Sequence, residues 1–129
     1  MLAVDTDVVV RYLTRDDAEQ FAKVNALIGG EDVHVCTIVL LETEWVLRRG
    51  YRFSRGQIIA ALTAFAGLPR VMLEDPALAA KALEWMRSGL GFADALHLAK
   101  AEGCEAFVSF DTRFAAVANA LSEIKVRAP

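Results

Sequence analysis

The sequence predicts a three-layer α/β/α fold, in which helices cover both faces of a central parallel sheet of four to five short strands. Short apolar runs alternate with segments of helical periodicity along the chain. Strands that are separated by helices pair in parallel, with the helices on the faces of the sheet. No repeat, low-complexity tract or linker interrupts this pattern. A single domain over residues 1–129 is therefore expected.

Each strand is predicted from a short apolar run between turn or helix-cap residues. In chain order the expected strands are Leu2–Val4, Val33–Cys36, Arg70–Leu73, Ala106–Phe110 and Ile124–Val126.

The helices are predicted from apolar spacing together with start and stop residues. Serine or aspartate stands at several expected starts, glycine at most ends, and Asp75-Pro76 combines an N-cap with proline in the first turn. The expected helices are Thr6–Leu13, one from Asp16 or Asp17 to Gly29-Gly30, Ile38–Arg49, one from Ser54 to Gly67, one from Asp75-Pro76 to Ser88-Gly89, Phe92–Glu102 and Thr112–Asn119.

Composition limits the class of protein. The chain is 55% hydrophobic with a mean hydropathy of +0.34, which suits a well-filled core and leaves apolar surface for an oligomer or a partner. It has no apolar stretch long enough to span a membrane and no signal-peptide pattern, and Cys36 and Cys104 form no disulfide or zinc motif. A cytoplasmic protein is expected. The net charge of −3 argues against a general nucleic-acid-binding module but is compatible with an enzyme.

Two of the acidic residues follow predicted strands. Asp5 ends the first strand and Asp111 ends the fourth, at the strand ends where parallel sheets place their ligand sites. Each could instead simply cap the helix that follows. Asp94 lies in the first turn of the helix in "GFADALHLA", where the helix dipole also favours an acid.

Glu42 is predicted to face inward. Its neighbours three and four residues away along the helix are all apolar, whereas Glu44 has Arg48 at i+4 and is predicted to form a solvated pair. A buried glutamate is either protonated or held by a positive charge brought from elsewhere in the fold.

Together the four acids predict a metal site. Converging carboxylates repel one another unless a cation compensates, and oxygen ligands favour Mg²⁺ or Mn²⁺.

Four segments, in order, resemble the PIN domain and, within it, the VapC-type toxins of bacterial toxin–antitoxin pairs: "AVDTDVVVRYL", "TIVLLETEWVLR", "GFADALHLA" and "FVSFDTRFA". The resemblance implies one metal cluster with catalytic and metal-binding roles for Asp5, Glu42, Asp94 and Asp111, supported by the hydroxyls of Thr6 and Ser109. The family often has asparagine two residues after the first aspartate. Here Asp7 stands at that position and is expected to face solvent near the helix start.

The resemblance also implies an activity and partners. It implies a Mg²⁺- or Mn²⁺-dependent endoribonuclease that leaves 5′-phosphate ends and acts as the toxin of a type II toxin–antitoxin system. A homodimer and a cognate antitoxin are implied as well. Arginines are candidates for holding the RNA backbone, although those near Gly50 could equally form a solvated helix end. The candidates are Arg11, Arg48, Arg49, Arg52 and Arg113.

Two alternative functions remain open from the sequence. "LAVDTDVVV" also matches the opening motif of haloacid dehalogenase-type phosphatases, in which Asp5 would be the nucleophile and Asp7 the acid/base. That fold needs a lysine and a second aspartate pair after a later strand, and "FVSFDTRFA" offers only one aspartate without its expected neighbours. It also leaves Glu42 without a role. The second alternative is a PIN-like fold that acts only as a binding module, and loss of a cluster acid would favour it.

Overall fold

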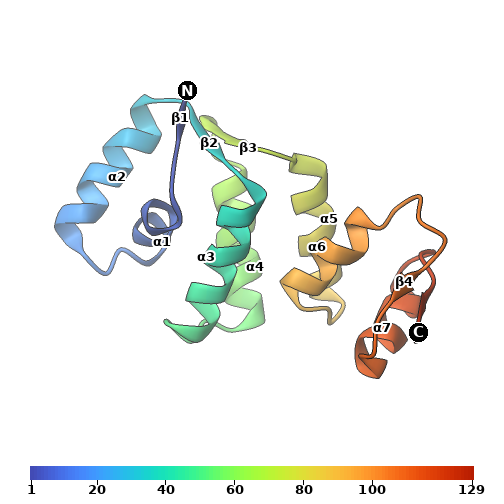
Figure 1. The fold of residues 1–129 in the computed structure, drawn as a ribbon. Coiled ribbons are helices and arrows are strands. Elements are labelled where there is room, and N and C mark those ends of the chain that lie inside the picture. Colours follow the sequence, from blue (N-terminus) through green and yellow to red (C-terminus); the bar gives the residue numbers. More distant parts are fainter. The chain divides into compact units, whose positions relative to one another are not determined.

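The computed structural model describes residues 1–129 as a mixed α/β protein (Figure 1). The chain divides into two compact units, the N-terminal unit Met1–Pro76 and the C-terminal unit Ala77–Pro129. No helix combines the length and the hydropathy needed to cross a membrane.

The N-terminal unit contains three strands and four helices. These are β1 (Leu2–Ala3), α1 (Thr6–Thr14), α2 (Ala18–Gly30), β2 (Val33–Val35), α3 (Thr37–Arg49), α4 (Arg55–Ala66) and β3 (Val71–Leu73).

The three strands form a parallel sheet in the order β1-β2-β3, with Leu2 paired to Val33 and Val33 paired to Val71. The central strand β2 is the most buried, because Val33 and Val35 are both fully enclosed. Helix α1 packs against α2 and α3, and α4 packs against α3 and β3. The core of this unit includes the buried side chains of Leu47 and Phe65.

The C-terminal unit contains most of α5 (Pro76–Arg87), followed by α6 (Phe92–Lys100), β4 (Phe107–Val108), α7 (Thr112–Leu121) and β5 (Val126–Arg127). Strands β4 and β5 pair in parallel, with Phe107 opposite Val126. Asn119 of α7 clamps β5, because its amide donates to the Val126 carbonyl and its carbonyl accepts from the Val126 N–H, both at 2.9 Å.

The predicted α/β class and the parallel pairing are confirmed. Five strands form, as a three-stranded and a two-stranded parallel sheet. Most helix boundaries agree within a residue or two, and Asp17 rather than Asp16 caps α2. Helix α6 ends at Lys100, earlier than predicted, and Gly103 lies beyond its end with a φ of +87°. Strand β4 is also shorter than predicted, because its backbone pairing with β5 involves few residues.

Candidate metal-binding site

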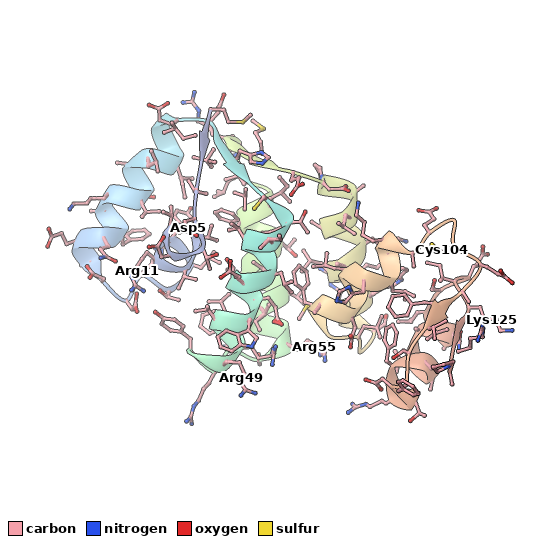
Figure 2. All side chains as sticks on the ribbon, viewed as in Figure 1. Asp5, Arg11, Arg49, Arg55, Cys104 and Lys125 are labelled. Atoms are coloured by element: carbon pink, nitrogen blue, oxygen red, sulfur yellow. The ribbon has the colours of Figure 1, made fainter.

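Asp5 lies between β1 and α1 and is the N-cap of that helix. Its Oδ1 accepts a hydrogen bond from the Thr6 N–H at 2.7 Å. The capping alternative is therefore confirmed, but capping engages Oδ1 and leaves Oδ2 without a protein donor. Asp5 is exposed, so this free oxygen can reach a ligand (Figure 2). Asp7, in the first turn of α1, is exposed as predicted.

The prediction for the two glutamates of α3 is wrong in both directions. Glu42 is exposed, and Glu44 is only 3% exposed. Two of the four apolar neighbours that predicted an inward Glu42 are themselves exposed, Ile38 at 67% and Trp45 at 57%, whereas Val39 is buried. Glu44 does pair with Arg48, whose Nε donates to both carboxylate oxygens at 3.1 and 3.2 Å. A buried carboxylate with its own cation is stable in this position, because the local pair offsets the cost of desolvation.

The other two predicted ligands belong to the C-terminal unit. Asp94 is half-buried in the first turn of α6, where its Oδ2 faces the backbone of Gly91. Asp111 is exposed and caps α7, with Oδ1 accepting from the Phe114 N–H at 2.9 Å. Ser109 supports this cap, because its Oγ accepts from the Asp111 N–H at 3.0 Å.

Each unit thus supplies two of the four acids. None of the four forms an ion pair with a lysine or arginine, so their charge is not neutralised by the protein. Within either unit, no group of three or more acidic, histidine or cysteine side chains lies close enough to hold a metal ion.

The residues present fit a hard divalent cation. The donors are carboxylate oxygens, which Mg²⁺ and Mn²⁺ prefer. Next to Asp5, the hydroxyl of Thr6 is buried and makes no hydrogen bond. A buried polar atom without a protein partner is unusual, and a hydroxyl in this state is suited to support a bound ligand. This orphaned hydroxyl adjoins the first predicted ligand.

The candidate RNA-binding arginines divide into two groups. Arg11 and Arg48 are engaged within the N-terminal unit, Arg48 by Glu44 and Arg11 by Gln20 and Tyr51. The exposed side chains of Arg49, Arg52 and Arg113 form no ion pair. These three remain available for an anionic ligand.

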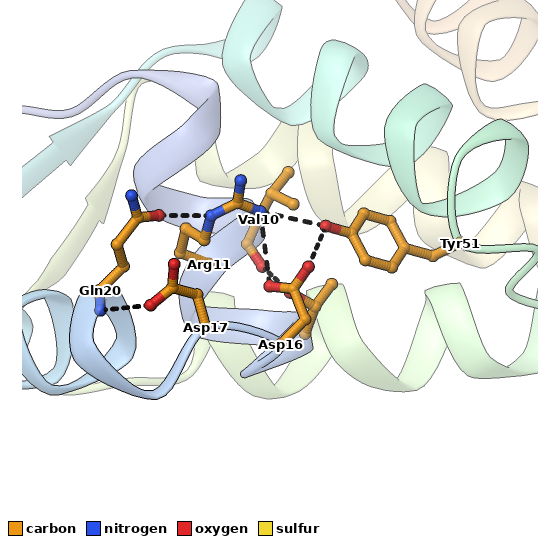
Figure 3. A network of polar contacts seen from close by, with 7 residues as sticks. Val10, Arg11, Asp16, Asp17, Gln20 and Tyr51 are labelled. Carbon is orange, nitrogen blue, oxygen red and sulfur yellow. Dashed lines mark hydrogen bonds and ion pairs between the residues drawn. The ribbon is translucent and has the colours of Figure 1, made fainter.

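A polar network that the sequence did not predict surrounds Arg11 (Figure 3). Its Nε donates to Gln20 Oε1 at 2.6 Å, and its Nη1 donates to the Tyr51 hydroxyl at 3.0 Å. The Tyr51 hydroxyl in turn donates to Asp16 Oδ2 at 2.6 Å. The hydrogen bond from Tyr51, then that from Thr14, and the nearby guanidinium of Arg11 lower the pKa of Asp16. The same tyrosine and the charge of Asp16 raise the pKa of Arg11.

No local sequence pattern indicates this network, because Tyr51 lies 40 residues from Arg11 along the chain. Only the packing of α1 against α3 brings the two regions together.

Comparison with known proteins defines the class. The family model of the PIN domain matches residues 2–120. The chain therefore belongs to the PIN-domain family. A solved structure similar to this chain is that of Mycobacterium tuberculosis VapC20, a Sarcin-Ricin loop cleaving toxin, with 24% sequence identity, 90% of this chain and 94% of that chain covered, and a TM-score of 0.44. No curated protein matches the chain significantly.

Proposed function

We propose that this protein is a Mg²⁺- or Mn²⁺-dependent endoribonuclease that hydrolyses RNA phosphodiester bonds as the VapC-type toxin of a type II toxin–antitoxin system. The observation that carries the proposal is the PIN family match over residues 2–120, a span that contains all four acids in their expected segments. The proposal includes a cytoplasmic location, a homodimer and a cognate antitoxin that covers the acidic site.

In this proposal the two units together form one PIN-like domain, and Asp5, Glu42, Asp94 and Asp111 hold the metal. Three of these carboxylates are exposed and the fourth is half-buried, and none has a cation of its own. Four converging acids without a metal would repel one another, so the bound cation is what makes their convergence favourable. Thr6 and Ser109 support the site, Thr6 through its unpartnered hydroxyl and Ser109 through its hydrogen bond to the cap residue Asp111.

When bound, the divalent ion would supply an activated water and stabilise charge on the leaving oxygen. The carboxylates would fix its position, and the free Oδ2 of Asp5 is a suitable ligand because capping engages only Oδ1. Arg49, Arg52 and Arg113 would hold the RNA backbone by charge. Because the attacking group is water rather than the 2′-hydroxyl, the products should carry 5′-phosphate and 3′-hydroxyl ends.

The test is cleavage of a mixed RNA pool by purified protein free of antitoxin, in Mn²⁺, in Mg²⁺ and in EDTA. A variant with both Asp5→Asn and Asp94→Asn removes one ligand from each unit. Asp17→Asn is the matched control for Asp5→Asn, because Asp17 also caps a helix and its replacement removes the same single charge. We expect cleavage with either metal that EDTA and the double variant abolish and the control retains.

Two outcomes would contradict the proposal. Release of phosphate from p-nitrophenyl phosphate, without RNA cleavage, would favour the phosphatase alternative and make Asp5 a nucleophile. The PIN match over nearly the whole chain does not favour that outcome. Metal-independent RNA binding without cleavage of any RNA, including total cellular RNA, would favour the binding module.

A further inference from the structure

The loop between α3 and α4, Gly50–Ser54, carries exposed arginines in a defined conformation. Arg49 is the last residue of α3, directly before the loop, and Arg52 lies at the centre of the loop. Neither guanidinium has an ion-pair partner. Figure 2 shows the Arg49 side chain projecting away from the end of α3. Unpaired guanidinium groups on one short loop are suited to bind the phosphates of a nucleic acid.

The backbone of this loop is held in a strained conformation. Arg52 has a φ of +56°, in the left-handed region that residues other than glycine rarely adopt. Such a conformation persists only when the surrounding structure enforces it. On one side the Gly50 N–H donates to the Val46 carbonyl at 2.7 Å, and the Phe53 N–H donates to the Leu47 carbonyl at 3.0 Å. These bonds fix both ends of the loop to α3.

The other anchor is the side chain of Tyr51. Its hydroxyl accepts from Arg11 of α1 and donates to Asp16 between α1 and α2, so one phenol ties the loop to a second part of the N-terminal unit. Arg11 is itself fixed by Gln20 of α2. Tyr51 also packs edge-to-face on Phe53, with the ring centroids 6.5 Å apart. The residue immediately before the strained Arg52 is therefore restrained in three directions.

We propose that Gly50–Ser54 is a preformed phosphate-binding loop for single-stranded RNA. Its Arg52 and the adjoining Arg49 contact the RNA backbone, and Tyr51, through Asp16 and Arg11, is a positioning residue. This inference rests on the proposed function, because it assigns the RNA of that function to a surface. It makes Arg11 a support for the binding loop rather than a contact to RNA. Preorganisation matters here because a free arginine loop would lose conformational entropy on binding.

The experiment measures binding of a short fluorescein-labelled single-stranded RNA of mixed sequence by anisotropy, in EDTA so that no cleavage occurs, between about 50 and 200 mM salt. Arg52→Ala should weaken binding about fivefold and reduce the slope of log K against log salt by about 0.7, the value for one phosphate contact on a single strand. Tyr51→Phe should weaken binding about threefold and lower the same slope, although it removes no charge.

A double-variant cycle separates positioning from general stability. If Tyr51 acts through the arginines, Tyr51→Phe should have no further effect on RNA affinity in an Arg49→Ala, Arg52→Ala background. Tyr12→Phe is the matched control, because the Tyr12 ring packs on Phe21 and Phe65 while its hydroxyl has no hydrogen-bond partner. In cleavage assays Tyr51→Phe should raise KM and leave kcat unchanged.

The outcomes are distinct. Unchanged affinity and salt slope in Tyr51→Phe, or an equal loss with and without the arginines, would overturn the positioning role while leaving the ribonuclease proposal intact. Salt-dependent RNA binding that is unaffected by removal of both arginines would move the contact elsewhere and overturn the loop assignment. Absence of RNA binding and cleavage by the unaltered protein would overturn the proposed function and, with it, this inference.

Discussion

The two units of this protein differ in the polar contacts that stabilise each of them internally. In the N-terminal unit, residues far apart in sequence are joined by hydrogen bonds: Arg11 with Tyr51, Arg70 with Asp32, and the backbone N–H of Thr37 with the Glu74 carboxylate. In the C-terminal unit, the contacts of Asp111 and Asn119 reach at most seven residues along the chain. Asp5 and Glu42 therefore lie in a unit whose helices and strands are joined by contacts between distant parts of the chain. The C-terminal acids lie at helix starts that are fixed locally.

This difference predicts which acidic residues should affect the free energy of unfolding and which should affect only activity. An acid that caps a helix contributes to local structure through one oxygen, whatever else its second oxygen does. An acid that is exposed and unpaired, such as Glu42, contributes little to folding and is free for another role. Variants of the two units should therefore have different effects on activity and on the free energy of unfolding.

The largest expected effect tests whether both units serve one site. Asp5→Asn and Asp94→Asn should each lower the rate of metal-dependent RNA cleavage by about 100-fold or more, because each removes a proposed ligand. The double variant should be little worse than either single variant, since ligands of one metal act as a unit. Rates from single-turnover cleavage check this. Loss of activity from only one unit's variant would contradict a site shared by both.

A second prediction compares one polar contact from each unit. Asn119→Ala leaves the Val126 N–H and carbonyl without their partner and should lower the free energy of unfolding by about 2 kcal/mol. Arg70→Ala removes an exposed ion pair with Asp32 and should cost about 0.5 kcal/mol. Urea unfolding followed by circular dichroism measures both. A larger loss of unfolding free energy from Arg70→Ala than from Asn119→Ala would contradict this comparison.

A third prediction concerns the two glutamates of α3. Glu44→Gln weakens a buried carboxylate's contact with the half-exposed Arg48 and should cost about 1 kcal/mol of stability. Glu42→Gln should leave stability within about 0.5 kcal/mol, because Glu42 is exposed and unpaired, yet abolish most RNA cleavage. Thermal unfolding and cleavage rates distinguish the two. The reverse pattern would restore the sequence-based orientation of this helix.

The smallest expected effect is the response of the Arg11 network to acid. The hydrogen bond from Tyr51 lowers the pKa of Asp16 below its ordinary value of 3.8. A carboxyl with a lowered pKa stabilises the folded state above the unfolded pKa, and this stabilisation is lost as pH falls from that value through the folded pKa. Tyr51→Phe should therefore lower Tm slightly at pH 6 and have less effect in strong acid. A constant difference in Tm across this range would show that Asp16 does not titrate with the network.

Local sequence patterns predicted most of the element boundaries because the physical causes are local. The Ser54 side chain accepts from the Gln57 N–H, and the Gln57 side chain accepts from the Ser54 N–H, so this helix start is specified within four residues. Asp111 and Asp17 cap their helices in the same local way. The spacing of apolar residues failed to predict which of Glu42 and Glu44 is buried, because it shows only that one face of the helix carries apolar residues. It does not show which side the rest of the protein covers.

The sequence by itself determined the α/β class, the order of the helices and strands, and the four acids in their family segments, because periodicity, caps and segment order are properties of the chain. Only the tertiary structure decided which glutamate of α3 is buried and that Arg11 is already engaged. It alone showed that Tyr51 joins Arg11 and Asp16. Those features depend on contacts between residues that are distant along the chain, and the free energy of such contacts is set by packing rather than by local sequence.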